Sequence, residues 1–159
     1  MYKLKDFIDI NKLDLELLNK NANAVNYFEE NTHLIKYNYI VLNENAVHIL
    51  ENNLYKINYD LLGWNKNAIN IIENNLDKIN WCYLSSNENA VHILENNLDK
   101  IDWTELSGNK KALHIIENHI DKVDWSYLCK NENALHIIEK HIDNIDWDFL
   151  SFNEMPYIY

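Results

Sequence analysis

The sequence of 159 residues is poor in glycine, proline and cysteine, with two, one and two of each, and it contains no arginine or glutamine. Scarce glycine and proline exclude a glycine-rich phosphate loop and a proline-rich linker. The cysteines, Cys82 and Cys129, stand 47 residues apart with no second cysteine or patterned histidine beside them. Neither a disulfide framework nor a zinc site is therefore expected, and a reducing, cytoplasmic location is predicted.

Long apolar runs and excess positive charge are also missing. No run of 18 apolar residues exists, and the first residues, MYKLKDFIDINKLDLELL, carry acidic side chains where a signal peptide would be apolar. The formal net charge is −11, so the electrostatic attraction that drives binding to phosphate is absent. We expect no contact with a membrane and no direct binding of nucleic acid.

The sequence repeats with a period of 22 residues. The segment NENAVHILENN occupies 43–53 and recurs unchanged at 87–97. An asparagine opens each repeat, an alanine follows three residues later, and a glutamate follows eight residues after the asparagine. We therefore predict an N-terminal cap at 1–20, six repeats at 21–152 and a C-terminal partial repeat at 153–159.

Each repeat is predicted to form two helices. Asn87 can accept a free backbone N–H as an N-cap, and the apolar residues after it share one face of a helix of about nine residues. Asp102 can cap a second helix, of about five residues, that places Trp103 and Leu106 together. Such short helices persist only when neighbouring repeats stack. The predicted fold is all-α, a single domain of residues 1–159 that forms a right-handed α-solenoid of about six 22-residue helical hairpins with degraded terminal caps.

Residues at equivalent positions of successive repeats form what we call a column. In one column, polar side chains point toward the apolar side of the longer helix. Asn and His are enriched at positive φ, and a left-handed residue just past a helix end satisfies the last carbonyl groups. We therefore predict that this column ends each helix at positive φ, in place of the scarce glycine. The alternative is a buried asparagine ladder that bonds to the loop of the next repeat. The column consists of Asn31, Asn53, Asn75, Asn97, His119 and His141.

The residues that could carry chemistry have simpler structural explanations. The tryptophan column, Trp81, Trp103, Trp125 and Trp147, is predicted to fill the core, and a stacking platform for bases or sugars is the alternative. A histidine column with a glutamate three residues later could hold a metal, but soluble zinc sites need three or four converging ligands. No acidic pair is singled out as acid and base. We predict no catalytic residue, no metal and no cofactor.

The repeat unit N-x-N-A-[VIL]-x-[IL]-[IL]-E-x-[NH]-[LI]-D-x-I-[ND]-W-x-x-L-S resembles the short Asn-Ala-Ile repeat found in proteins of giant DNA viruses that infect amoebae. Residues 21–152 carry it, most faithfully at 87–151. The family often has proline after the first asparagine, and this chain does not. The 28 asparagines are typical of an AT-rich genome, as such viruses have. The resemblance implies a helical repeat array that binds proteins, located in the host cytosol or the viral factory.

These features predict a non-enzymatic scaffold for protein–protein interaction whose partner is a host or viral protein. An acidic decoy that mimics nucleic acid and occupies a DNA- or RNA-binding protein is the alternative, and an enzyme is disfavoured. We expect a monomer or a weak homo-oligomer through the ends. Partner contacts are assigned to side chains of the longer helix that the stacking does not need, and we call these residues the stripe. The stripe consists of His48, His92, His114, His136, Glu51, Glu95, Glu117, Glu139, Asn52, Asn74, Asn96 and Asn118.

Overall fold

The computed structural model describes residue 5 and residues 8–153. Those residues form thirteen α-helices and eight 3-10 helices with no strand, so the prediction of an all-α chain is confirmed. They divide into two compact units, unit 1 within residues 1–80 and unit 2 within 81–159. The division falls inside a repeat, and the single domain stays a prediction. Most of the predicted C-terminal partial repeat, residues 154–159, lies outside the described part of the chain.

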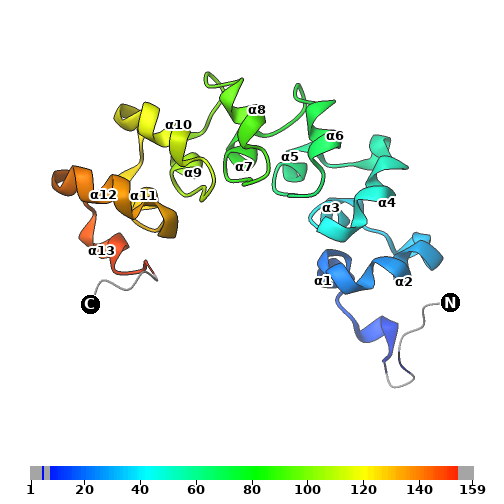
Figure 1. The fold of residues 1–159 in the computed structure, drawn as a ribbon. Coiled ribbons are helices and arrows are strands. Elements are labelled where there is room, and N and C mark those ends of the chain that lie inside the picture. The colour runs from blue at the N-terminus through cyan, green and yellow to red at the C-terminus, as the bar shows by residue number, and fades with distance from the viewer. Residues whose placement is uncertain (1–4, 6–7, 154–159) are drawn as a thin grey trace. The chain divides into compact units, whose positions relative to one another are not determined.

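Unit 1 alternates longer and shorter helical elements along the chain (Figure 1). Its elements are η1 (Ile10–Lys12), α1 (Leu15–Lys20), η2 (Ala22–Ala24), α2 (Val25–Glu30), η3 (Thr32–Leu34), α3 (Tyr37–Ile40), η4 (Glu44–Ala46), α4 (Val47–Glu51), η5 (Leu54–Lys56), α5 (Tyr59–Leu62) and α6 (Ile69–Glu73). The short helices α1 and α3 pack side by side.

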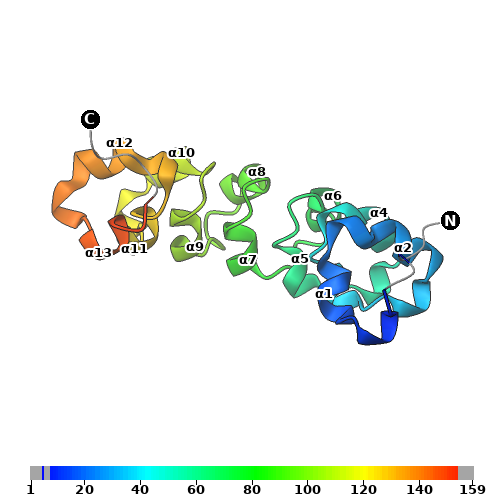
Figure 2. The ribbon, with the colours of Figure 1, turned by 90° about the horizontal axis from the view of Figure 1, so that it is seen from below.

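Unit 2 has the same order of elements, but its α-helices at the predicted longer and shorter positions differ little in length. Its elements are α7 (Trp81–Ser85), α8 (Val91–Glu95), α9 (Trp103–Ser107), α10 (Leu113–Asn118), η6 (Ile120–Lys122), α11 (Trp125–Leu128), η7 (Glu132–Ala134), α12 (Leu135–Ile138), η8 (Glu139–Asn144) and α13 (Trp147–Leu150). The short helices α7, α9, α11 and α13 pack on one another in chain order (Figure 2). No helix within residues 8–153 has the length and apolar character that a membrane span requires.

The asparagine that opens a repeat caps the turn that leads into the longer helix. Asn87 Oδ1 accepts the backbone N–H of Asn89 at 3.0 Å. Asp102 Oδ1 accepts the N–H of Glu105 at 3.1 Å and caps the shorter helix, so this predicted N-cap is confirmed. The N-cap residue of α8 is Ala90, so the prediction of Asn87 as the N-cap of that helix is wrong by one turn. The α-helices are shorter than expected because the first turn after the asparagine is 3-10 or irregular, as η4 shows. Equivalent bonds form at Asn43, Asn65, Asn109 and Asn131.

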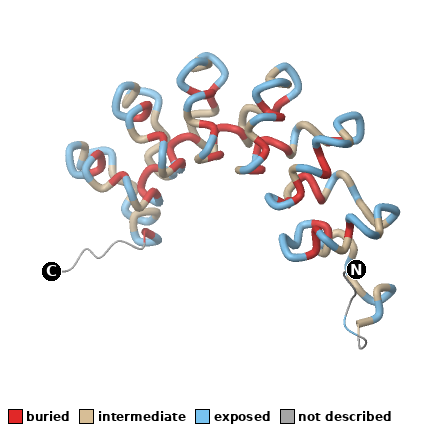
Figure 3. Tube along the Cα trace, turned by 45° about the vertical axis from the view of Figure 1, so that its right-hand side comes forward, coloured by how far each residue is buried: buried red, intermediate tan, exposed pale blue. Residues whose placement is uncertain are grey.

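The core consists of apolar columns at equivalent positions of successive repeats. The alanine column is buried, and the leucine column of the short helices is fully buried from Leu62 to Leu128, with exposed fractions of 0% at both Ala112 and Leu106. Leu150, in the last short helix, is only half-buried. Isoleucine and leucine from the longer helices complete the core, and Ile116 is also 0% exposed. In Figure 3 the buried residues form the inner part of each helical hairpin, and the outer turns are exposed.

The predicted helix ends at positive φ are wrong. No described residue has a positive φ. Asn53 and His119 have φ values of −140° and −138° and lead into 3-10 turns. In their place, the Asn97 amide Nδ2 donates to the carbonyl oxygen of Ile93 at 2.8 Å, and Asn53 makes the same bond to Ile49. The side chain itself satisfies the orphan carbonyl, so a left-handed turn is not needed.

This geometry reverses the expected effect of a glycine at the helix end. Asn97→Gly removes the bond to Ile93 and adds backbone freedom, so we expect the free energy of unfolding to fall by about 1 to 2 kcal/mol in urea denaturation. Asn97→His is the control, because His119 at the same position keeps its Nδ1 2.9 Å from the carbonyl oxygen of Ile115. A glycine variant as stable as the parent chain would restore the positive-φ interpretation.

A buried asparagine ladder does exist, but in another column. Asn43 is 1% exposed, and its Nδ2 donates to the carbonyl oxygens of Asn19 at 3.0 Å and Asn21 at 2.8 Å in the preceding repeat. Asn131 makes the equivalent pair of bonds in unit 2. The residue that caps one repeat therefore also ties it to the repeat before.

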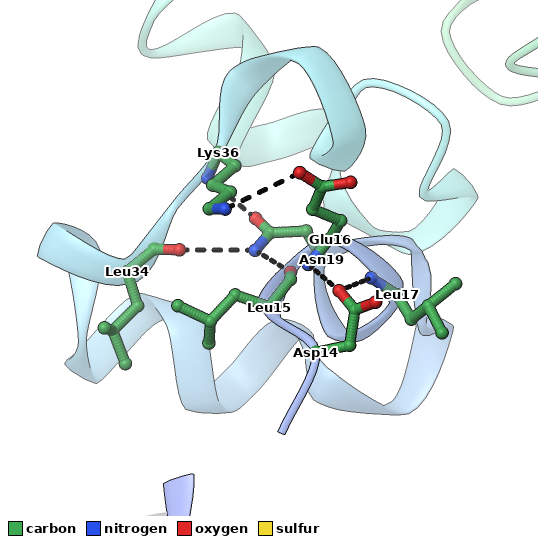
Figure 4. Close-up of polar contacts among 7 residues, drawn as sticks. All are labelled: Asp14, Leu15, Glu16, Leu17, Asn19, Leu34 and Lys36. Carbon is green, nitrogen blue, oxygen red and sulfur yellow. Dashed lines mark hydrogen bonds and ion pairs between the residues drawn. The ribbon is translucent and has the colours of Figure 1, made fainter. Parts of the chain in front are cut away.

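A second buried link joins successive short helices. The Asn19 side chain, 0% exposed, donates Nδ2 to the carbonyl oxygens of Leu15 at 2.7 Å and Leu34 at 3.2 Å, and its Oδ1 accepts the N–H of Lys36 at 2.9 Å (Figure 4). Ser107 stands at the same repeat position, and its Oγ accepts a backbone N–H of the following repeat at 3.0 Å. The 22-residue spacing is thus fixed by polar contacts as well as by apolar packing.

Candidate functional site

The stripe lies where the sequence predicted it, on the outward side of the longer helices. All twelve of its residues are exposed. They come from α4, α8, α10 and α12 and from the ends that follow α4, α6 and α8. Exposure at equivalent positions of successive repeats makes this face available to a partner.

The stripe is not free of structural roles, however, and that premise of the prediction is wrong. The His48 Nε2 lies 2.7 Å from the Glu29 Oε1, and the His136 Nε2 lies 3.1 Å from the Glu117 Oε1. Each contact joins a histidine to the glutamate of the preceding repeat, not to the glutamate three residues later. His114 pairs with Glu95 in the same way. We call each such pair a rung. Because both side chains are about half exposed, a rung is expected to contribute only about 0.2 to 1 kcal/mol.

The asparagines of the stripe also stabilise the ends of their own helices. Nδ2 of Asn52 donates to the carbonyl oxygen of His48 at 2.8 Å, and Nδ2 of Asn96 donates to that of His92 at 2.7 Å. Asn74 makes the same bond to Asn70 at 2.7 Å. These bonds leave the side chains exposed, so the assignment of partner contacts to the stripe stays a prediction.

Two grooves lie beside the stripe, one in each unit, at the same register of the repeat. The groove in unit 1 has a volume of 180 Å³ and the groove in unit 2 a volume of 150 Å³. Each lies between the end of one longer helix and the side and end of the next, with apolar side chains and a glutamate in its lining. The groove of unit 1 is lined by Glu51, Leu54, Asn70, Ile71, Asn74 and Asn75. The groove of unit 2 is lined by Glu117, Ile120, Ile137, Lys140 and His141.

The two grooves differ in how their glutamate is neutralised. In unit 2, Glu117 forms the rung with His136 and also lies 3.9 Å from the Nζ of Lys140. In unit 1, the residue that would face Glu51 is Asn70, where other repeats have histidine. No cation within residues 8–153 forms an ion pair with Glu51. Sequence reasoning missed this, although the asparagine that interrupts the histidine column was visible.

The tryptophan column is not the core that the sequence predicted. Trp103 is only half-buried, and Trp147 is 63% exposed. The ring face of Trp103 carries the ammonium of Lys122, from the next repeat, at 5.0 Å. The equivalent pair of Tyr59 with Lys78 is 4.9 Å apart. Lysines of the next repeat therefore cover the rings of Trp81 and Trp103, an arrangement that stabilises repeat stacking. Trp125 lies beside His141, with ring centroids 5.5 Å apart.

The two cysteine thiols have raised pKa values, which disfavours nucleophilic chemistry. Burial raises the pKa of Cys129, an effect opposed by a hydrogen bond from the backbone of Asp146. Burial and the nearby carboxylates of Asp102 and Glu105 raise the pKa of Cys82. A raised pKa disfavours the reactive thiolate.

The described side chains also give no assembled metal site. No group of three or more His, Cys, Asp or Glu side chains converges in a way that could hold a metal ion within residues 8–153. What recurs from repeat to repeat is the exposed stripe with its grooves. A comparison of the chain with protein-family models, curated proteins and solved structures finds no match.

Proposed function

We propose that the six repeats stack as a right-handed α-solenoid, that the chain belongs to the giant-virus Asn-Ala-Ile repeat proteins it resembles, and that it serves as a non-enzymatic scaffold for a host or viral protein. The observation that carries the proposal is the recurrence of the exposed stripe and its grooves at one register of the repeat. Repeat proteins bind through several neighbouring units at once, which such a surface suits.

The charge arrangement favours this function over the acidic decoy. A mimic of nucleic acid needs a row of carboxylates without counter-charges, as phosphates are. Glu29 and the stripe residues Glu95 and Glu117 each face a histidine of the next repeat. Carboxylates that already contact an imidazole within the chain are less open to a basic partner than phosphates are.

The test compares two double variants with the same change in net charge. Glu51→Lys with Glu139→Lys alters the stripe without breaking a described rung, and Asp60→Lys with Asp148→Lys alters exposed positions on the short helices. Each protein is used as bait in an amoebal lysate at about 0.05 and 0.5 M salt. We expect the stripe variant to lose its partner and the short-helix variant to keep it, with melting temperatures within a few degrees of the parent.

Three results would reject the scaffold on this face. Equal capture by both variants would move the site off the stripe. Equal loss by both, together with collapse of binding at high salt, would indicate the decoy, because that mechanism depends on net charge. No specific partner at either salt concentration would reject the scaffold itself.

A further inference from the structure

One groove combines an unneutralised carboxylate with the shape of a side-chain site. In the described rungs, Glu29, Glu95 and Glu117 each contact the imidazole Nε2 of a histidine 19 residues further along the chain. Counting 19 residues from Glu51 reaches Asn70, which has no cationic group. The carboxylate of a rung is thus present at Glu51 while the histidine that would pair with it is absent.

The chain itself shows what fits such a groove. In unit 2, the Lys140 side chain lines the equivalent groove and brings its Nζ to 3.9 Å from the Glu117 carboxylate. Asn74 occupies the position of Lys140 in unit 1, so the imidazole and the ammonium that face Glu117 in unit 2 are both replaced by neutral amides. Two lysines close along the chain have other contacts: Lys56 covers the Tyr37 and Tyr55 rings, and Lys78 donates to the Asn75 Oδ1 at 2.9 Å and covers the Tyr59 ring.

The walls of the unit 1 groove suit a long side chain with a charged head. Leu54 is 42% exposed and Ile71 is 5% exposed, and together they offer an apolar surface for methylene groups. Glu51, Asn70 and Asn74 place a carboxylate and two amides at the rim. A guanidinium carries five N–H donors in a planar fork that matches a carboxylate and can reach amide oxygens, whereas an ammonium acts as a point charge.

We propose that the groove between the second and third repeats, around Glu51 and Asn70, is a binding site for an arginine side chain of the partner protein. This rests on the proposed scaffold function and names the chemistry of its partner. Because the chain contains no arginine, a second copy of it cannot supply that side chain. A single half-exposed ion pair binds weakly, so affinity arises when the stripe engages neighbouring repeats together.

The experiment is a nuclear magnetic resonance titration of the ¹⁵N-labelled full chain with the peptide acetyl-Gly-Arg-Gly-amide. We expect saturable shifts, with a Kd on the order of millimolar, at the amides of Glu51, Leu54, Asn70 and Asn74. The citrulline peptide, a neutral isostere, should bind at least about tenfold more weakly, and the lysine peptide should fall between them. Shifts spread evenly over the acidic surface, or equal binding of the citrulline peptide, would overturn the proposal.

Two matched variants test whether arginine binds at Glu51 because Asn70 stands in place of histidine. Asn70→His installs the residue that four other repeats have at this position, so the fold should be kept, and it should weaken arginine binding at least about tenfold by filling the rung. His136→Asn with Lys140→Asn recreates the unit 1 arrangement in unit 2 and should add a second set of saturable shifts around Glu117. Unchanged binding in Asn70→His, or no second site in unit 2, would overturn the proposal.

The titration is independent of the lysate experiment. Partner capture that depends on the stripe, with no arginine shifts at Glu51, would keep the scaffold and reject this site. Arginine shifts at Glu51 without any captured partner would keep the site and reject the scaffold.

Discussion

Replacing Asn131 with alanine is expected to lower the free energy of unfolding by about 3 to 5 kcal/mol, because one buried side chain serves three partners. Its Oδ1 accepts the N–H of Asn133 at 3.1 Å, and its Nδ2 donates to the carbonyl oxygens of Ser107 at 3.2 Å and Asn109 at 3.1 Å. With the residue 1% exposed, water cannot replace those bonds. Urea denaturation followed by circular dichroism measures the loss.

The matched control is the asparagine that opens the first repeat. Asn21 makes the same N-cap bond to the N–H of Asn23, at 2.9 Å, but its side chain is exposed. Asn21→Ala is therefore expected to cost only about 1 kcal/mol, as a cap does. Equal losses at Asn21 and Asn131 would show that the ladder adds nothing beyond capping.

The ladder explains an abundance that the sequence alone attributed to AT-rich codon usage. Asparagine carries a donor and an acceptor on one short side chain, so it can cap its own helix and bond the preceding repeat at once. Aspartate lacks the donor and serine has a single oxygen. At Asn43 and Asn131 the side chain needs both functions. Codon bias alone would not place asparagine so regularly at buried positions.

What could be predicted from the sequence is what lies within one repeat. The N-cap at Asp102 and the bond from the Asn89 N–H to the Asn87 side chain follow from residue preference and helix geometry alone. The burial of Ala112 and Leu106 follows from an apolar column with a helical spacing. The all-α class follows from the same periodicity, together with the absence of alternating strand patterns.

What could not be predicted lies between repeats. A helical wheel places His48 beside Glu51, but the structure pairs it with Glu29, 19 residues earlier. Trp103 was expected in the core because it is large and apolar, yet Lys122 of the next repeat covers its ring while the edge stays exposed. Such contacts depend on how far one repeat is shifted and turned relative to the next. A single sequence carries no direct signal of that shift.

Charge pairing across repeats is another example of such a contact. Lys110 follows the capping asparagine, at the positive end of a helix, where a cation is unfavourable within its own repeat. Its Nζ lies 2.9 Å from the Glu132 Oε1, at the same position of the following repeat. Along this column, glutamate and lysine alternate from Glu44 to Glu132. A residue that is unfavourable within its own helix can therefore be stabilised by an ion pair with the next repeat.

Leu106→Ala is expected to lower the free energy of unfolding by about 2 to 5 kcal/mol, because it removes a fully buried side chain from the column that joins the short helices. Leu106 is 0% exposed. Leu17→Ala is the control with the same substitution on a short helix, at a side chain that is 64% exposed, and it should change stability by less than about 0.5 kcal/mol. Both are measured by urea denaturation at one protein concentration.

Comparing the stability of Trp103→Ala with that of Leu106→Ala distinguishes a core filled by tryptophan from a core filled by leucine. If the aromatic column filled the core, Trp103→Ala would cost more than Leu106→Ala, because the ring is larger. With Trp103 half-buried under Lys122, we expect the opposite order, and acrylamide should quench its fluorescence in the folded protein. The smaller side chain has the larger effect because stability follows the apolar area removed from water, and in this repeat the leucine column is the part that is fully removed.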